Sequence, residues 1–237
     1  MNEAIWPTDL GNRKLAVLCS GGLDSAVLLG EACQRYDLVQ PIYIATGSTW
    51  ETLELSAIRQ FIQATHFSQM QPLKILTVDT RDLYDNHWSH TGKNVPDHLS
   101  PDEAVYLPGR NVVLLAKSLI WCHLQGITTI ATAPLAANPF PDATPTFYRD
   151  FAHVVGVAVG DTLKIIRPYE YLNKSQVVLR GAGMPLEHTF SCIAPIYDHH
   201  CGACNKCAER IAAFQQAGVP DPTVYANCSN NLPPIPV

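Results

Sequence analysis

The sequence predicts an α/β protein with a doubly wound parallel sheet and a small cysteine-rich region near its C-terminal end. Short apolar, strand-like segments alternate with segments that carry apolar residues at helical spacing. That alternation is typical of a parallel sheet with helices on both faces. A loop of small and hydroxylated residues follows the first strand, and a cluster of four cysteines follows the last strand.

The alternation continues through most of the chain. The expected strands are 15–19, 41–46, 73–79, 127–132 and 163–168. The expected helices are 24–35, 51–65, 111–124, 145–159, 174–181 and 208–217. The segment 80–108 is rich in His, Asp, Asn and Pro, and we expect a long loop there, with room for one short helix, on the side where ligands bind. We divide the chain into an α/β domain (1–183) and a metal-binding region packed on it (184–237).

Composition narrows the class of protein. The chain has 237 residues, 47% of them hydrophobic and 16% charged, which is enough for one large core. A net charge of −5 argues against a dedicated nucleic-acid binder. No apolar run has the length of a membrane span, and the first residues lack the basic start and apolar core of a signal peptide. We therefore expect a soluble, cytoplasmic protein.

The loop 20–25, with sequence SGGLDS, ends the first strand and opens the first helix. A helix N-terminus offers unpaired N–H groups and the positive end of a dipole to an anion. Gly21 and Gly22 let the backbone approach phosphate oxygens, and the hydroxyls of Ser20 and Ser25 add donors. The loop lacks the Gly-Lys-Ser/Thr ending of a Walker A motif and the G-x-G-x-x-G fingerprint. An ordinary capped helix start is the structural alternative, and it does not explain the glycine pair.

This loop resembles the SGGxDS motif of the PP-loop ATP pyrophosphatases, which cleave ATP between the α and β phosphates to adenylate a carbonyl or carboxylate oxygen. The resemblance implies that the loop holds the pyrophosphate of ATP. It also implies that the aspartate is linked to Mg²⁺. The residues to which these nucleotide-binding roles are carried over are Ser20, Gly21, Gly22, Leu23, Asp24 and Ser25.

Four cysteines form a cluster with the spacing C-x₈-C-x₂-C-x₂-C: Cys192, Cys201, Cys204 and Cys207. Two overlapping C-x-x-C steps and one distant cysteine suffice for a tetrahedral site. We expect structural Zn²⁺, because four protein ligands leave no open position for catalysis. A redox dithiol and an iron–sulfur cluster are the open alternatives. Lys206 and Arg210 can offset the negative charge of the thiolates, and we interpret His199 and His200 as solvated loop residues.

Further segments make the sequence similar to the 7-cyano-7-deazaguanine synthase family. LPGRNVVLL (107–115) looks like the family's PGRN segment, and LNKSQVV (172–178) looks like its Ser/Asn-Lys helix start. TFSC (189–192), CGACNKC (201–207) and AGVPDPTVY (217–225) resemble its C-terminal signature in sequence and order. Members of this family convert a 7-carboxy-7-deazaguanine to the nitrile with ATP and ammonia.

The resemblance implies an ATP-dependent ligase that forms carbon–nitrogen bonds, with ATP, Mg²⁺ and Zn²⁺ as cofactors. Its substrates are a small carboxylate and ammonia, and a homodimer is expected. Transfer of AMP gives a carboxylate a leaving group that ammonia can displace, and a second activation would dehydrate the amide. Ser20, Asp24, Arg110 and Lys174 are the candidate catalytic residues. From spacing alone, Arg110 is equally well an ordinary arginine at the start of a helix, and Lys174 is equally well a solvated lysine.

The segment 131–147 departs from the family, whose members have a GxN…D…SGYPDCRxEF stretch there. The aromatic-Pro-Asp core remains, and Phe140, Asp142 and Asn111 are the candidate substrate-pocket residues. Two acids and an arginine that would hold a guanine-like edge are absent, which should weaken binding of such a base. Three alternatives follow. They are a family member acting on another carboxylate (a modified deazapurine or a protein or peptide terminus, as in bacterial antiviral defence), a tRNA-thiolating PP-loop enzyme, and a non-catalytic ATP-binding module.

Overall fold

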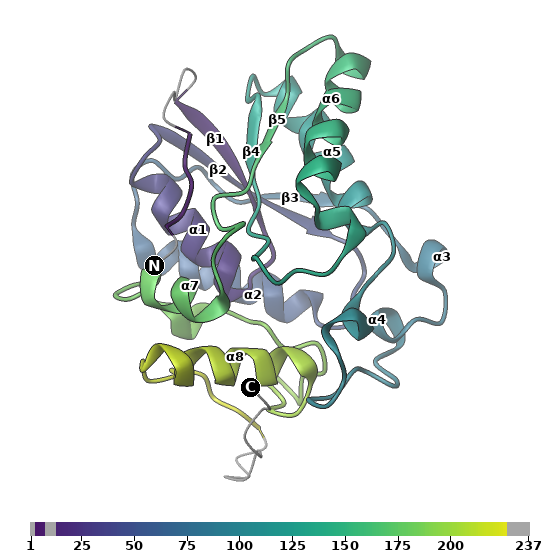
Figure 1. The fold of residues 1–237 in the computed structure, drawn as a ribbon, viewed down its shortest axis with the longest axis vertical. Coiled ribbons are helices and arrows are strands. Elements are labelled where there is room, and N and C mark those ends of the chain that lie inside the picture. The colour runs from purple at the N-terminus through teal and green to yellow at the C-terminus, as the bar shows by residue number, and fades with distance from the viewer. Residues whose placement is uncertain (1–2, 8–12, 227–237) are drawn as a thin grey trace.

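The computed structural model describes residues 3–7 and 13–226 and contains a five-stranded parallel sheet covered by helices (Figure 1). The strands are β1 (Lys14–Cys19), β2 (Leu38–Ala45), β3 (Lys74–Thr77), β4 (Thr129–Ala131) and β5 (Lys164–Ile166). The principal helices are α1 (Leu23–Cys33), α2 (Glu51–Thr65), α5 (Arg110–Leu124), α6 (Pro145–Val159), α7 (Lys174–Arg180) and α8 (Asn205–Ala217). Each expected strand and helix is present, and α8 begins three residues earlier than expected.

The long connection between β3 and α5 is more structured than its weak periodicity indicates. It holds two helices of four residues each, α3 (Arg81–Tyr84) and α4 (Trp88–Thr91), and the 3₁₀ turn η1 (Asp102–Val105). Such short helices cover barely one turn, so they leave no periodic pattern in the sequence. Two further 3₁₀ turns are η2 (Pro141–Ala143) and η3 (Leu186–His188).

The strand order is β3-β2-β1-β4-β5, with every pairing parallel. Because β1 lies in the middle, the chain runs outward on one side of it and then returns to build the other side. This arrangement confirms the doubly wound α/β class. It also places the loop after β1 at the point where the strand order reverses, which is where ligands bind in such sheets.

The two faces of the sheet carry separate apolar cores. On one face, Leu15 and Val17 of β1 pack with α1, α2 and α7. On the other face, Ala16 packs with Ile42, Ile130 and the buried sides of α5 and α6. The alternation along β1 follows from the two-residue period of a strand, which sends successive side chains to opposite faces.

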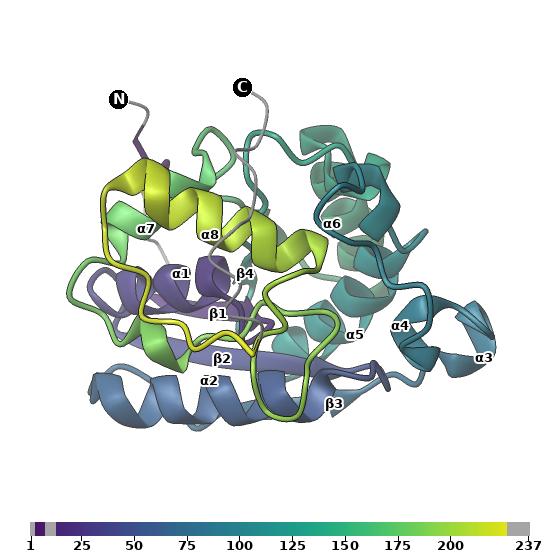
Figure 2. The same ribbon diagram turned by 90° about the horizontal axis from the view of Figure 1, so that it is seen from below.

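The C-terminal region forms an outer layer beside the carboxyl ends of the strands. Figures 1 and 2 show α8 running across the molecule next to α7, and α7 in turn packs on α1. A third buried cluster joins the four cysteines of the C-terminal region to Trp50 of the α/β layers and to Phe190. The backbone of Cys204 also pairs with that of Asp97 in the long β3–α5 connection. The division at residue 183 stays a prediction, and residues 227–237 lie outside the described part.

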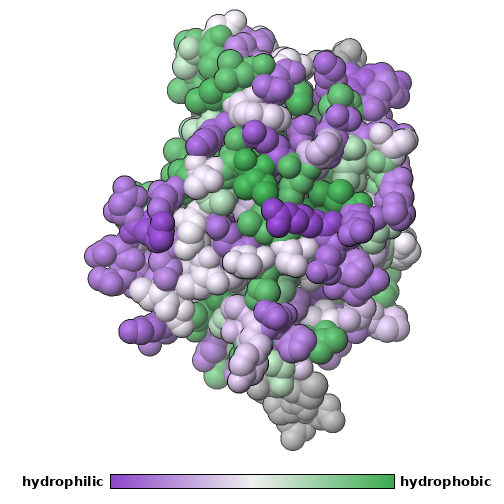
Figure 3. All heavy atoms as spheres, turned by 180° about the vertical axis from the view of Figure 1, so that it is seen from behind, coloured by the Kyte–Doolittle hydropathy of each residue, from purple (hydrophilic) through white to green (hydrophobic). Residues whose placement is uncertain are grey.

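The outer surfaces of α5 and α6 keep several large apolar side chains exposed, including Leu124, Val154 and Val157. The face opposite to that of Figure 1 likewise shows apolar patches between polar residues (Figure 3). Within the described residues, none of the helices combines the length and the apolarity that crossing a membrane requires. The expected homodimer stays a prediction.

Candidate active site

The SGGLDS loop is shaped by a close backbone contact at Gly21. This residue has φ +75°, and a Cβ placed on it would lie 2.5 Å from the carbonyl oxygen of Glu54 in α2. On its other side, the Gly21 carbonyl accepts a hydrogen bond from the Phe190 N–H at 2.8 Å. Only glycine fits both the positive φ and the contact with α2. The loop is therefore held between an early helix and the C-terminal region.

The hydroxyls of Ser20 and Ser25 brace the loop from inside. Their oxygens lie 3.2 Å apart, the Ser20 N–H donates to Ser25 Oγ, and the Gly22 N–H donates to Ser20 Oγ. Ser25 Oγ also donates to the Gly22 carbonyl at 3.1 Å. Gly22 is the N-cap of α1 and provides no side-chain cap, so no side chain competes for the first N–H groups of the helix. Such a terminus fits an anion.

Asp24, in the first turn of α1, belongs to a chain of alternating charges. Lys174 Nζ, at the start of α7, lies 2.7 Å from Asp24 Oδ2 and 3.2 Å from Glu209 Oε1 of α8. Lys206 Nζ lies 2.8 Å from Glu209 Oε2. The structure thus brings the predicted residues Asp24 and Lys174 together and adds Glu209 and Lys206. Lys174 is a largely buried ion-pair partner and not the solvated lysine of the structural alternative.

The charges in this chain support one another. Burial opposes the charged form of Lys174, but the two neighbouring carboxylates raise its pKa. For Glu209 burial also disfavours the charge, yet the two lysines lower its pKa to about 2. Burial raises the pKa of Asp24, with Lys174 opposing the shift. Asp24 Oδ1 is buried with no hydrogen-bond partner among the described residues, so it is an oxygen available to a ligand.

A cavity of about 430 Å³ opens at this loop. Its wall begins with Ser20, Gly22 and Asp24, and Lys174, Lys206 and Glu209 continue it. The segment 133–140 after β4 and the segment 190–193 of the C-terminal region also belong to it. Further lining residues are Trp50 at the N-cap of α2, Trp88 of α4, and Asp102, Val105 and Leu107 in and after η1. Its size is within the range of small-molecule sites, and it lies beyond the carboxyl ends of the strands.

Arg110 and Glu54 also line the cavity. Arg110 opens α5, and no described residue makes a hydrogen bond or an ion pair with its guanidinium. Glu54 Oε2 accepts from Tyr43 Oη at 2.6 Å, and Oε1 accepts from Trp50 Nε1 at 3.1 Å. Burial raises the pKa of Glu54 to about 7, although Arg110 and the two donors act against this shift.

The three candidate substrate-pocket residues lie in different places. Phe140 lines the cavity and stacks on Tyr106, with ring centroids 5.0 Å apart. Asp142 and Asn111 are not part of the lining, and they bond to each other instead. Asp142 Oδ2 accepts from the Asn111 N–H at 3.0 Å, and Asn111 Nδ2 donates to the Asp142 carbonyl at 2.9 Å. This pair joins η2 to the first turn of α5.

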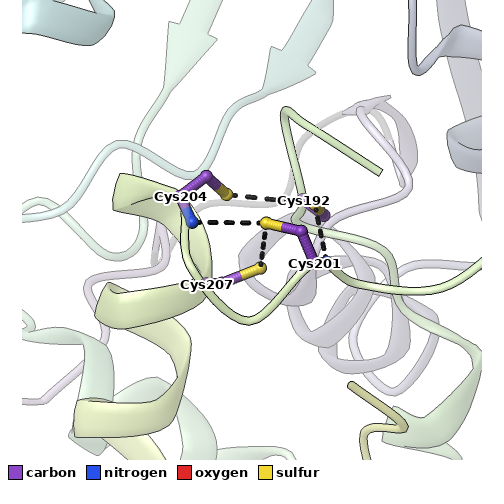
Figure 4. Close-up of side chains that lie close together, drawn as sticks. All are labelled: Cys192, Cys201, Cys204 and Cys207. Atoms are coloured by element: carbon purple, nitrogen blue, oxygen red, sulfur yellow. Dashed lines mark hydrogen bonds between the residues drawn. The ribbon is translucent and has the colours of Figure 1, made fainter. Parts of the chain in front are cut away.

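The four clustered cysteines are buried and converge on one point (Figure 4). All four Sγ atoms lie within 4.8 Å of one another, and two pairs are 3.9 Å apart. Backbone N–H groups of Cys201 and Ala194 donate to Cys192 Sγ, and those of Ala203 and Cys204 donate to Cys201 Sγ. A tetrahedron with metal–sulfur bonds of about 2.3 Å has sulfurs about 3.8 Å apart, so the cluster can hold one metal ion.

Two neighbours of the cysteines are more buried than the sequence indicates. The interpretation of His200 as a solvated residue is wrong. Its ring lies 4.5 Å from that of Phe190, and its Nε2 accepts a hydrogen bond from the Ser191 N–H. Burial lowers the pKa of His200 to about 4, so it is neutral at pH 7. Arg210 is also buried and donates to Thr189 Oγ1 at 2.9 Å, which fixes the segment before the first cysteine.

Sequence reasoning missed several residues of the cavity wall: Trp50, Glu54, Trp88, Lys206 as a partner in the charge chain, and Glu209. Trp50 and Trp88 stack with ring centroids 5.6 Å apart and an angle of 21°. Trp50 and Glu54 stand where α2 begins, directly after the second strand. The carboxyl end of that strand could have marked them as site residues.

Comparisons with known proteins identify the family of this chain. A family model described as queuosine biosynthesis protein QueC matches residues 14–218. The 7-cyano-7-deazaguanine synthase of Stenotrophomonas maltophilia (strain K279a) is 30% identical over 231 residues, covering 90% of this chain and 100% of that protein. The 7-cyano-7-deazaguanine synthase of Acidobacterium capsulatum is 28% identical, covering 91% of this chain and 98% of that protein.

A solved structure of a 4-thiouridine synthetase in complex with RNA and bound ATP aligns with a TM-score of 0.47 at 18% identity, covering 86% of this chain and 50% of that one. The curated relatives favour a synthase over the three alternatives that the sequence left open. Since the family model spans most of the chain and the relatives align over nearly their full length, this chain belongs to the QueC family of queuosine biosynthesis proteins.

Proposed function

We propose that this protein is an ATP-dependent ligase that converts 7-carboxy-7-deazaguanine and ammonia to 7-cyano-7-deazaguanine. The observation that carries the proposal is the uncapped, glycine-lined start of α1, which opens into the 430 Å³ cavity of a QueC-family chain. The N–H groups at this helix start would hold the β and γ phosphates of ATP. The α phosphate would then face the rest of the cavity, where a carboxylate can reach it.

Two activations account for the chemistry. In the first, a carboxylate oxygen of the base attacks the α phosphorus and pyrophosphate leaves. Ammonia then displaces AMP and, with loss of a proton, forms the amide. The amide oxygen attacks the α phosphorus of a second ATP and pyrophosphate leaves; AMP then departs with that oxygen as both N–H protons are lost, which gives the nitrile. Lys174 and Arg110 supply positive charge to the phosphates and to the substrate carboxylate, which lowers the barrier by electrostatic stabilisation.

The residues present fit the two expected metal ions. Asp24 has a carboxylate oxygen without a hydrogen-bond partner, and Mg²⁺ takes one or two carboxylates together with phosphate oxygens. When bound, Mg²⁺ neutralises charge on the leaving pyrophosphate. The four cysteine sulfurs have the separations that tetrahedral Zn²⁺ requires, and a cluster of several irons would instead need its thiolates on separate metal corners. Zinc would be structural here.

The test is turnover with ATP, ammonia and 7-carboxy-7-deazaguanine, followed by mass analysis of base and nucleotide. We expect the nitrile together with AMP and pyrophosphate. The double variant Ser20→Ala, Asp24→Ala should abolish turnover while the fold, followed by circular dichroism, and the metal content are retained. An unchanged base in the presence of bound ATP would contradict the proposal, and ADP in place of AMP would contradict adenylation.

A further inference from the structure

Two carboxylates of the cavity wall, Asp102 and Glu54, are used neither by the phosphate-binding loop (residues 20–25) nor by the charge chain at Lys174. Asp102 is exposed and accepts a hydrogen bond from Asn205 Nδ2, whereas Glu54 lies beside the stacked indoles of Trp50 and Trp88. We propose that Glu54 reads the hydrogen-bonding edge of the planar base, with these indoles as the adjoining aromatic wall. The inference rests on the proposed function and names the residues that give it specificity.

The position of Glu54 is fixed by two neutral donors. Tyr43 Oη donates to one carboxylate oxygen and Trp50 Nε1 to the other, at 2.6 and 3.1 Å. A carboxylate oxygen accepts more than one hydrogen bond, so both oxygens of Glu54 retain acceptor capacity. The backbone of the same residue touches Gly21 of the phosphate-binding loop. The carboxylate is therefore held at a defined distance from the loop that would bind the phosphates.

The chemistry of this carboxylate matches a guanine-type edge. Such an edge presents a ring N–H and an exocyclic amino N–H side by side, and one carboxylate accepts both. The segment 131–147 offers no acid for this purpose other than Asp142, which is occupied by Asn111. Phe140 of that segment contributes only an aromatic face to the cavity. Glu54 thus takes the place of the acids that this segment lacks.

Aromatic surfaces complete the match. Trp50 and Trp88 form one stacked pair, and Phe140 forms another with Tyr106. Both pairs contribute to the wall of the same cavity through Trp50, Trp88 and Phe140. Stacking on such faces holds a flat base but hardly distinguishes one base from another. Discrimination is therefore left to a hydrogen-bonding group, and Glu54 is that group.

The charges around Glu54 give the inference a pH signature. The groups that act on it are Arg110 of α5, Tyr43 of β2, Trp50 and Glu51. The carboxylate of Glu51 accepts hydrogen bonds from the backbone N–H groups of Thr46 and Gly47. Burial raises the pKa of Glu54 to about 7, and the base binds the ionised form. Affinity for the base should therefore rise as the pH increases through 7 and then level off.

The experiment is calorimetric titration of the full chain with 7-carboxy-7-deazaguanine and with its analogue that lacks the exocyclic amine. Glu54→Gln turns one acceptor into a donor that opposes the edge of the base. We expect binding of the amine-bearing base to weaken about tenfold to a hundredfold, the size of a bidentate contact. Discrimination between the two bases should largely disappear, and so should the pH dependence. ATP affinity should stay within twofold, which shows that the variant folds.

The matched control is Glu103→Gln, an exposed acid of η1 outside the cavity lining, which should behave like the parent. If the parent protein binds and converts the base and Glu54→Gln discriminates the two bases as the parent does, Glu54 does not read the edge, and the proposed function stands. If Glu54 had only a structural role, its replacement would weaken the binding of both bases equally. A selective loss of affinity for the amine-bearing base contradicts such a role. If the parent neither binds nor converts the base, the proposed function itself fails.

Discussion

Asp24 and Lys174 stand 150 positions apart in the chain and meet at 2.7 Å. The contact links the first turn of α1 to the first turn of α7, and Glu209 extends it to α8 at 3.2 Å from the same lysine nitrogen. One cation therefore joins the start of the sheet to the C-terminal layer. The proposed phosphate binding and the docking of α8 would therefore depend on the same side chain.

Replacing this cation with a neutral side chain should cost both stability and activity. Lys174→Met leaves two carboxylates without their shared partner in a largely buried place, and we expect a loss on the order of 3 kcal/mol in unfolding free energy. Chemical denaturation measures the loss. Adding Asp24→Asn to this variant should recover part of it, because one unpaired charge is then removed. Lys206→Met, whose lysine pairs with Glu209 alone, is the matched control and should cost less.

A methyl group at position 21 should disrupt the SGGLDS loop and, with it, the proposed phosphate binding. Gly21→Ala places a Cβ 2.5 Å from the Glu54 carbonyl oxygen in a residue with positive φ. We expect a loss of about 2–4 kcal/mol in unfolding free energy, from about 1 kcal/mol for the left-handed backbone and the rest from overlap. Pyrophosphate release should fall below detection. Gly160→Ala has a similar φ of +70° with open space around it, so it should cost only the backbone part.

The ionisation of Glu54 should be visible in stability without any ligand. Its pKa is about 7 in the folded protein against an ordinary value of 4.5. A carboxyl with a raised pKa contributes stability that is complete below pH 4.5 and is lost as the pH rises through 7. The unfolding free energy of Glu54→Gln should therefore rise relative to that of the parent by up to about 3 kcal/mol between pH 4.5 and 7.5, and by less where solvent reaches the group. Urea titrations at several pH values measure the difference, and a constant difference would contradict the raised pKa.

Metal removal should affect the cavity as well as the cysteines. Cys204→Ala removes one of four ligands, so zinc content should fall from about one per chain to nearly none. Because Phe190, Ser191 and Glu209 belong to the same region and to the cavity wall, turnover should be lost too. Cys122→Ala, which changes a buried cysteine of α5, should keep its zinc. Absorbance bands of an iron–sulfur cluster would overturn the assignment of zinc.

Asp142 should act on helix stability and not on recognition of the base. Its carboxylate caps the Asn111 N–H in the first turn of α5, where no side chain of the N-cap Gly109 does so. Asp142→Ala should cost about 1–2 kcal/mol in unfolding free energy. The affinity for ATP should stay unchanged. The exposed Asp150→Ala is the control with no measurable effect, and a specific loss of base affinity in Asp142→Ala would assign Asp142 to the pocket.

The sequence predicts the fold better than the site. The periodicity of apolar residues predicts the strands and the long helices, whereas α3 and α4 span four residues each and are too short to show a period. Glu54 and Glu209 look like ordinary solvated acids on amphipathic helices, and only packing shows that both line a cavity. His200 looks like a loop residue, and its burial depends on Phe190 and Tyr225, which the sequence does not place beside it.

The hydrogen bond from Phe190 to Gly21 has a consequence for protein synthesis. The SGGLDS loop is synthesised about 170 residues before the segment that closes its other side. At about 5–20 residues per second, the loop waits roughly ten seconds or more for its partner. A growing chain thus carries this loop for that time without the contact that closes it. Because Cys192 follows Phe190 by two positions, the loop is closed only when the segment of the clustered cysteines is also being made.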